Sequence, residues 1–267
     1  MSGNLGQTEP RPEPSGRRVL ITGGGAGMGR VMALSFAAAG ARVHIGDVDA
    51  SAVQRAREEI KGLSGSVADV SDEGQVAGLL EDAVRSLGGL DILVNNAGIP
   101  GPTAAVEAVD PADWRRTIEV DITGMFLVTR AAVPHLKASR GGSIVNMSST
   151  AGRLGFARRS PYAAAKWAVV GFTKSISIEL GPFDINVNCV QPGPVAGALQ
   201  DQVLAASAAA RGITQDEARA ERLRHVSMGR QVTQEEIAGV ILFLCSPAGH
   251  AISGQAIAVD GDQTALA

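Results

Sequence analysis

Three residues in the middle of the chain have the types and the spacing needed for proton transfer. Tyr162 and Lys166 lie four residues apart in a segment that follows Ser160-Pro161, and Ser149 precedes the tyrosine by thirteen residues. Side chains four residues apart on a helix share one face. An ammonium group beside a phenol favours the phenolate, so Lys166 would make Tyr162 able to exchange protons near neutral pH. Ser149 could hydrogen-bond a substrate oxygen and stabilise charge that develops on it.

A glycine-rich turn near the N-terminus has the sequence of a phosphate cradle. The segment Thr22-Gly23-Gly24-Gly25-Ala26-Gly27-Met28-Gly29 lies between a β-branched run and the helical pattern of residues 30–39. Glycines let the main chain turn tightly and approach a pyrophosphate, whose charge free N–H groups and the helix dipole would stabilise. Asp47, which is 18 residues beyond Gly29, ends the next expected strand. Its carboxylate could accept hydrogen bonds from the hydroxyls of a ribose.

The same carboxylate favours NAD over NADP as the cofactor. Asp47 would repel a 2′-phosphate, and neither Ala26 nor Val48 supplies a basic side chain to offset that repulsion. The alternative interpretation of Asp47 is an ordinary solvated residue at a strand end. Asp69, at the end of the third expected strand, is placed to meet the adenine.

The elements that must position these residues alternate along the chain from Arg18 onward. Short β-branched runs are separated by helical patterns, which is typical of βαβ units on a parallel sheet. The runs are nearly all apolar, so we expect helices to cover both faces of the sheet. Seven strands are expected, at Val19–Thr22, Ala41–Gly46, Gly65–Ala68, Leu90–Val94, Ser143–Met147, Ile185–Val190 and Ala256–Val259. The pattern predicts a doubly wound α/β fold.

Capping signals mark the beginnings of several helices. Some pair an N-cap residue with a proline in the first turn, and others have the spacing of a capping box. These signals are Asp110-Pro111, Ser160-Pro161, Thr233 with Glu236, and Thr214 with Glu217.

The organisation of the chain is that of a tail and one domain. Residues 1–17 are rich in proline and carry mixed charge without an apolar stretch, so we expect a disordered tail rather than a signal peptide. Residues 18–267 contain neither an internal repeat nor a long linker, which favours a single domain that binds NAD and carries out catalysis. Within it, residues 194–230 are polar and alanine-rich without a strand signal. We expect this segment to be helical and to act as a lid over the substrate.

The composition excludes several classes of partner. The 24 basic and 27 acidic side chains leave a net charge of -3, without the basic excess that binds nucleic acid or anionic membranes. The longest apolar runs fall well short of the roughly 20 residues that span a bilayer. Cys189 and Cys245 stand far apart in apolar runs, which favours buried, reduced thiols over a disulfide or a metal cage. We therefore expect a cytoplasmic protein that holds no metal and binds neither nucleic acid nor membrane.

Together, the motifs resemble those of the short-chain dehydrogenase/reductase family. The resemblance runs from about Arg18 to Gly261 and rests on five motifs in the right order. These motifs are Thr22-Gly23-x-x-x-Gly27-x-Gly29, Asn95-Asn96-Ala97-Gly98, Ser149, Tyr162-x-x-x-Lys166 and Pro192-Gly193.

The resemblance implies a single Rossmann-type domain with a seven-stranded parallel sheet, assembled as a homotetramer. It implies reversible hydride transfer between nicotinamide C4 and a secondary alcohol or ketone as the small-molecule substrate. Tyr162 would be the acid/base, Lys166 would also bind the nicotinamide ribose, and Ser149 would hold the substrate oxygen. Together with Asp47 and Asp69, the residues expected to bind the cofactor are Thr22, Gly23, Gly27, Met28, Gly29, Asn95, Ala97, Gly98, Tyr162, Lys166, Pro192, Gly193 and Val195.

Three positions depart from the family pattern. Asp121 stands where the fourth catalytic member is usually an asparagine, and its carboxylate would add negative charge near Lys166. That charge favours the neutral phenol, so we expect activity to survive with a more alkaline optimum. Gly197 stands where a threonine often holds the nicotinamide, and Asp262 stands where a second glycine is usual. Asp260 and Asp262 could suggest a cation, but a solvated tail is the interpretation we favour.

Two function classes follow from these residues, an enzyme with one close variant and a regulator. The leading prediction is an NAD-dependent alcohol dehydrogenase or ketone reductase. One alternative is a 3-oxoacyl thioester reductase that uses NADPH, against which Asp47 argues. The other alternative is a nucleotide-binding regulator whose turnover is weakened by Asp121 and Gly197, against which the intact Ser149, Tyr162 and Lys166 argue.

The substrate is not identified by the sequence. Arg153, Arg158 and Arg159 lie between Ser149 and Tyr162, so an anionic group on a substrate could meet a cation there. The interpretation we favour is that these arginines are solvated or lie at a subunit interface.

Overall fold

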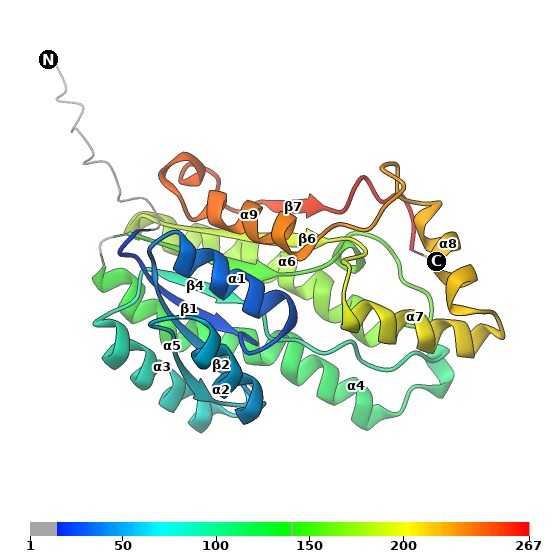
Figure 1. The fold of residues 1–267 in the computed structure, drawn as a ribbon, viewed down its shortest axis with the longest axis horizontal. Helices are drawn as coiled ribbons and strands as arrows, with labels where there is room; N and C mark the ends of the chain where they lie inside the picture. The colour runs from blue at the N-terminus through cyan, green and yellow to red at the C-terminus, as the bar shows by residue number, and fades with distance from the viewer. Residues whose placement is uncertain (1–14, 140, 267) are drawn as a thin grey trace, which may run out of the picture.

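One parallel sheet organises the chain (Figure 1). The computed structural model describes residues 15–139 and 141–266. Within them the sheet has seven strands in the order β3-β2-β1-β4-β5-β6-β7. The strands are β1 (Arg18–Thr22), β2 (Arg42–Asp47), β3 (Ser64–Val67), β4 (Ile92–Asn95), β5 (Gly142–Met147), β6 (Ile185–Pro192) and β7 (Ala256–Val259). All seven expected strands are confirmed, with ends that shift by at most two residues.

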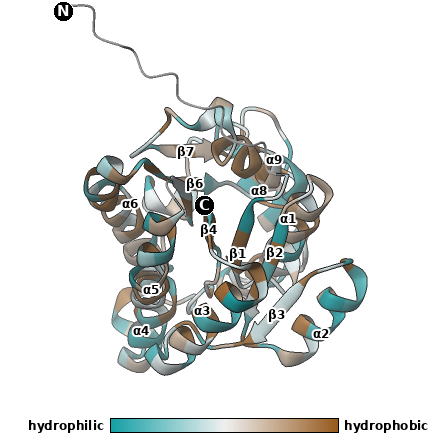
Figure 2. Cartoon of the chain, turned by 90° about the vertical axis from the view of Figure 1, so that its left-hand side faces the viewer, coloured by the Kyte–Doolittle hydropathy of each residue, from teal (hydrophilic) through white to brown (hydrophobic). Residues whose placement is uncertain are grey.

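Helices cover both faces of this sheet (Figure 2). One face carries α1 (Gly27–Ala38), α2 (Ala50–Glu59) and α9 (Gln234–Leu244). The other carries α3 (Glu73–Leu87), α5 (Gly124–Ala138) and α6 (Ser160–Leu180). α4 (Pro111–Ile118) leads into α5 through the π-helical turn η2 (Glu119–Thr123). The short turns are η1 (Val106–Ala108), η3 (Thr150–Gly152), η4 (Gly181–Phe183) and η5 (Pro247–Gly249).

The core follows from the alternation of side chains along each strand. In β1, Val19 and Ile21 pack on the face of α1, while Leu20 packs on the face of α3. All three side chains are completely buried. Because both faces of a parallel sheet are covered, side chains on both faces of such a strand are buried, and this explains the nearly continuous apolar runs. The expected doubly wound α/β architecture is confirmed.

Two further helices stand apart from these layers. α7 (Ala198–Arg211) and α8 (Gln215–Leu223) lie beyond the carboxyl ends of the strands (Figure 1). They fall in the 194–230 segment, so its helical character is confirmed. An isolated parallel bridge between Val195 and Val232 joins the two ends of this segment.

Three of the four capping signals are confirmed. Asp110 caps α4, and the Thr214 and Thr233 capping boxes begin α8 and α9. The expectation for Ser160 is wrong, because α6 already begins at Ser160 and Arg159 occupies the N-cap position. The main-chain carbonyl of Arg159 accepts from the Ala163 N–H, which places the first turn one residue earlier than the Ser-Pro signal indicates.

The expected tail is three residues too long at its C-terminal end. Residues 1–14 of the predicted disordered tail lie outside the described residues. Gly16, however, donates its N–H to the Gly40 carbonyl at 2.8 Å, and Arg17 is buried. The neighbouring Arg18 binds the Asp91 carboxylate through both its main-chain N–H and its guanidinium. Together with the bond from the Arg17 guanidinium to the Asp91 carbonyl, these contacts fasten residues 16 and 17 to the segments that precede β2 and β4.

The remaining compositional expectations concern the thiols and membrane helices. Cys189 and Cys245 are buried and free, as expected. Burial raises the pKa of the Cys245 thiol to about 12. Among residues 15–139 and 141–266, no helix has the length and the apolar character to span a membrane.

Candidate active site

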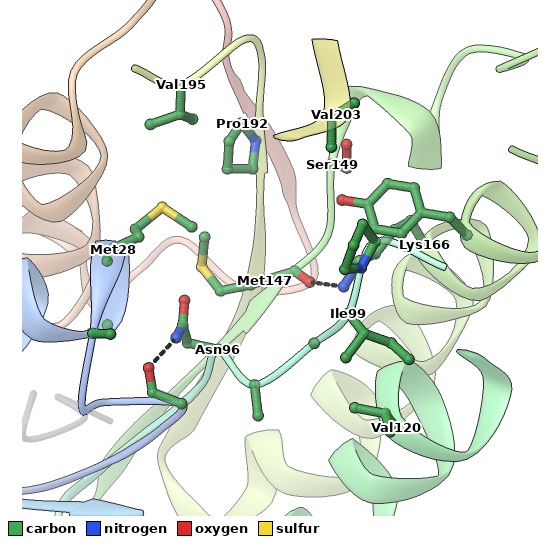
Figure 3. Close-up of a pocket in the computed structure, with 18 of the residues that line it drawn as sticks. Met28, Asn96, Ile99, Val120, Met147, Ser149, Lys166, Pro192, Val195 and Val203 are labelled. Atoms are coloured by element: carbon green, nitrogen blue, oxygen red, sulfur yellow. Dashed lines mark hydrogen bonds between the residues drawn. The ribbon is translucent and has the colours of Figure 1, made fainter. Parts of the chain in front are cut away.

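A cleft of about 560 Å³ opens at the carboxyl ends of the strands. The glycine turn forms one wall, and the starts of η3 and α6 form the opposite wall. In Figure 3, Met28 and Val195 lie on one side, Ser149 and Lys166 lie on the other, and Met147 lies between them. In sheets of this kind, ligands bind where the strand order reverses, which here is between β1 and β4.

The glycine turn forms a cradle with no side chains at its centre. Gly27 has a φ of 51°, which favours glycine, and a Cβ added there would meet only open space. A Cβ on Gly29 would collide with the carbonyl oxygen of Gly23, so this glycine allows α1 to start directly against the turn. The first turn of α1 therefore presents free N–H groups to the cleft, which fits a pyrophosphate.

Two carboxylates line the far end of the cleft. Asp47 accepts from the Gly25 N–H at 2.9 Å and from the Asp49 N–H at 3.0 Å. These bonds fix its carboxylate beside the glycine turn. Asp69 accepts from Ser71 and forms an ion pair with Arg116 at 2.9 Å. Although desolvation opposes the shift, these partners hold the pKa of Asp69 below its usual range.

Two residues expected to bind the cofactor stand behind the cleft wall instead. The Thr22 hydroxyl accepts from the main-chain N–H groups of Asn96 and Ala97. Asn95 is buried, and its amide donates to Thr129 and Asn146. Neither Thr22 nor Asn95 lines the cleft. They hold the loop after β4 in place.

Asn96 is a positioning residue that sequence reasoning missed. Its amide Nδ2 donates to the main-chain carbonyl of Thr22 at 3.0 Å and to that of Gly23 at 2.9 Å. Figure 3 draws one bond from this amide. It therefore ties the loop after β4 to the glycine turn. Its place within Asn95-Asn96-Ala97-Gly98 was the available signal.

The remaining expected cofactor residues line the cleft. Gly23, Gly27, Met28, Gly29, Ala97, Gly98, Pro192, Gly193 and Val195 all do so. The bridge to Val232 uses the main-chain groups of Pro194 and Ala196. No hydrogen bond in the described part of the chain uses the N–H of Val195, which leaves it available to a ligand.

Ser149, Tyr162 and Lys166 meet at one end of the cleft. Ser149 follows β5 and caps η3, where its hydroxyl accepts from the Ala151 N–H at 3.1 Å. The Lys166 ammonium lies 5.4 Å from the centre of the Tyr162 ring, as expected for neighbours on one helix face. Lys166 Nζ also donates to the Met147 carbonyl at 3.2 Å (Figure 3).

Asp121 lies directly behind this lysine. One carboxylate oxygen accepts from the Ile99 N–H at 2.7 Å, and the other lies 3.2 Å from Lys166 Nζ. Burial alone would lower the pKa of Lys166, but the charges of Asp121 and Tyr162 outweigh it and raise that pKa. Asp121 is completely buried and does not line the cleft. It therefore acts on the site through Lys166.

The two other departures from the family pattern have different surroundings. Gly197 lines the cleft at a φ of 138°, and the amide of Gln234 lies where a side chain would start. Asp262 has a φ of 61°, a conformation that aspartate tolerates because its side chain bonds locally. Its carboxylate accepts from the Ser227 hydroxyl at 2.5 Å.

The three arginines between Ser149 and Tyr162 have different partners. Arg153 forms an ion pair with Asp260, and exposed Arg158 donates to the Ala210 carbonyl. Arg159 is neither solvated nor at the molecular surface, which corrects our expectation. Its guanidinium carbon lies 5.1 Å from the centre of the Tyr162 ring.

Comparison with known proteins identifies relatives of this chain. A family model described as enoyl-(acyl carrier protein) reductase matches residues 23–262. The chain is 41% identical over 256 residues to trans-4-hydroxycyclohexanecarboxylate dehydrogenase of Sinomonas cyclohexanicum, covering 92% of each chain. It is 36% identical over 250 residues to 3-oxoacyl-[acyl-carrier-protein] reductase FabG of Thermotoga maritima, covering 92% of this chain and 97% of that protein. The crystal structure of NAD⁺-bound xylitol dehydrogenase superposes with a TM-score of 0.90 at 28% identity, over 94% of this chain and 100% of the other.

Proposed function

The chain belongs to the short-chain dehydrogenase/reductase family, and we propose that it is an NAD-dependent enzyme that transfers hydride between nicotinamide and a secondary alcohol or ketone. The observation that carries this proposal is the meeting of Ser149, Tyr162 and Lys166 at one end of a cleft whose other end is the glycine cradle. One site thus joins a dinucleotide cradle to an acid/base group. This supports an enzyme over a nucleotide-binding regulator.

The side chains divide the proton chemistry between them. When bound, the nicotinamide would supply the carbon that accepts or gives the hydride. The Tyr162 phenolate takes the proton of the carbinol hydroxyl in oxidation, and the resulting phenol returns it in reduction. The Ser149 hydroxyl lies on the same wall of the cleft and orients the substrate oxygen. The Lys166 ammonium stabilises the phenolate form of Tyr162.

Asp47 supports NAD rather than NADP. Its carboxylate is fixed by two main-chain N–H groups at the end of the cleft next to the glycine turn. A 2′-phosphate at this position would meet a negative charge that cannot swing away. The exposed neighbour Val48 provides no cation to offset it.

The substrate class is a small alcohol or ketone. A relative acts, by its name, on a hydroxycyclohexanecarboxylate, so substituted cyclohexanols and cyclohexanones are the first candidates. The second candidate class is a 3-oxoacyl thioester, which the similarity to the 3-oxoacyl reductase supports.

We also propose an organisation around this site. Residues 18–267 form the catalytic domain, and residues 194–230 close over the substrate as a lid. Val203 and Arg222 of this segment line the cleft, which supports that role. A homotetramer and a cytoplasmic location remain proposals from the family resemblance and the free thiols.

The experiment is NADH formation or consumption with a panel of secondary alcohols and ketones, including cyclohexanols, cyclohexanones and a 3-oxoacyl thioester, with NADPH in parallel. We expect turnover of ring substrates with NADH and loss of turnover in Tyr162→Phe. Nucleotide binding without turnover of any substrate would contradict the proposal and leave the regulator.

A further inference from the structure

Two arginines stand at the substrate end of the cleft without an acidic partner. Arg159 is only 4% exposed, and the one described hydrogen bond of its guanidinium goes to the Pro100 carbonyl at 2.5 Å. Arg222 comes from α8 and is partly buried. The Nε atoms of both guanidinium groups are buried without a hydrogen-bond partner among the described residues. No carboxylate of residues 15–139 and 141–266 forms an ion pair with either arginine.

Both guanidinium groups pack against one aromatic ring. Their central carbons lie 5.2 Å (Arg159) and 5.6 Å (Arg222) from the centre of the Phe156 ring. Burial lowers the pKa of Arg222 to about 10, and the charge of Arg159 contributes to the shift. Two like charges that are buried together are costly unless an anion joins them.

The side-chain charges around Phe156 are unbalanced. The only carboxylates that line the cleft in the described residues are Asp47 and Asp69, which lie at the opposite end. Asp121 is already committed to Lys166. A second cavity of about 210 Å³ shares Phe156, Arg159, Val203 and Arg222 with the cleft, and no described carboxylate lines it. The substrate end therefore carries an excess of positive charge.

We propose that Arg159 and Arg222 bind a carboxylate of the substrate, so that the enzyme acts on hydroxy acids and oxo acids. Guanidinium groups match carboxylates because they can donate two parallel hydrogen bonds. Arg159 lies 5.1 Å from the Tyr162 ring, so the carboxylate would sit only a few bonds from the carbinol carbon, as in a compact acid. The cofactor phosphates would lie at the glycine cradle, on the opposite wall. This assignment of substrate class rests on the proposed function.

The kinetic test compares an acid with its own neutral ester. With 4-oxocyclohexanecarboxylate and its methyl ester, we expect the wild-type protein to show a higher kcat/KM for the acid. In Arg159→Gln and in Arg222→Gln, the ratio of the two values should fall roughly 10- to 100-fold, chiefly through the KM of the acid. Arg224→Gln is the matched control, because Arg224 is exposed at the end of the same helix and lines neither cavity. An acid-to-ester ratio that is unchanged in both cleft variants would overturn the proposal.

A binding test separates this proposal from the proposed activity. Cyclohexanecarboxylate and cyclohexanecarboxamide have no carbinol, so calorimetric titration measures their binding without turnover. We expect the carboxylate to bind more tightly than the amide, and that preference to be lost in Arg159→Gln and Arg222→Gln. If the carboxylate binds more tightly than the amide but no alcohol is turned over, only the proposed activity is refuted. Equal binding of acid and amide by the wild-type protein would refute only the carboxylate site. If one of the two arginine variants does not fold, the binding preference measured with the other variant is enough to test that site.

Discussion

Lys166 Nζ lies 3.2 Å from Asp121 Oδ2, and both side chains are buried. The pKa of Lys166 is raised, so the stabilisation that its charge provides is complete below the ordinary lysine pKa and is lost only as the pH rises through the higher folded value. The lysine thus stays charged throughout the neutral range. Its charge is shared, however, between the carboxylate behind it and the phenol in front of it.

Replacing Asp121 tests how that charge is shared. In Asp121→Asn the amide oxygen can still accept from the Ile99 N–H, but the lysine loses its counter-charge. More of its field then acts on Tyr162, so we expect the pH–rate profile to move by about one unit to lower pH. We also expect a loss of about 3 kcal/mol in unfolding free energy, because a buried charge is left unpaired. Steady-state rates across pH and thermal unfolding measure the two effects, and an unmoved profile would reject this role.

Tyr162→Phe removes the proton-transfer group and leaves the cofactor wall intact. We expect kcat to fall at least about 100-fold, in line with the usual contribution of an acid/base group, with NAD affinity changed little. Stopped-flow rates and NADH fluorescence titration measure the two quantities. Because Tyr162 is the only tyrosine, an ultraviolet pH titration of the wild-type protein also reports this phenol alone. A variant with near-wild-type kcat would assign the proton transfer to another group.

The sheet and the cradle could be predicted because their signals are local. Apolar runs mark strands, and the distance from Gly29 to Asp47 follows from one βαβ unit. Arg222 could not be found in this way, because it reaches the cleft from a helix 60 residues beyond Tyr162 and belongs to no motif. Burial of Arg159 was missed for a similar reason, since its surroundings are assembled from distant segments of the chain.

The predicted and observed positions also differ for residues directly behind the cleft wall. Thr22 and Asn95 sit in motifs that mark the cofactor site, and a motif does not tell which of its side chains face the ligand. In the structure their hydroxyl and amide groups bond to the chain itself. Within one motif, residues that face the ligand are adjacent in sequence to residues that support them from behind. Sequence spacing therefore does not distinguish the two kinds.

Asp47→Ser should relax the choice of cofactor. The serine removes the negative charge that would face a 2′-phosphate, and the bonds from the Gly25 and Asp49 N–H groups are weakened. We expect kcat/KM for NAD to fall about 10-fold and that for NADP to rise by a similar factor. Initial rates with both cofactors measure the change. An unchanged preference for NAD would show that another residue discriminates between them.

His44 on β2 should make the fold sensitive to acid. Its two ring nitrogens lie 2.9 Å from the Ser64 hydroxyl and 3.1 Å from the Ser66 hydroxyl, and burial lowers its pKa to about 4. The unfolded chain binds a proton at the ordinary histidine pKa near 6.5, so the unfolded state takes up protons first as the pH falls. Stability is therefore complete above about pH 6.5 and should decline by about 2 to 3 kcal/mol as the pH falls towards 4.

His44→Asn provides the comparison for this effect. The variant should be less stable at neutral pH because it loses one of the two serine contacts, yet its unfolding free energy should change less between pH 6.5 and 4. Urea unfolding at several pH values gives the slope of unfolding free energy against pH for the wild-type protein and for the variant. Only the difference between these two slopes is assigned to His44, because the acidic side chains also titrate in this range. Equal slopes in the two proteins would show that carboxylates alone cause the loss of stability in acid.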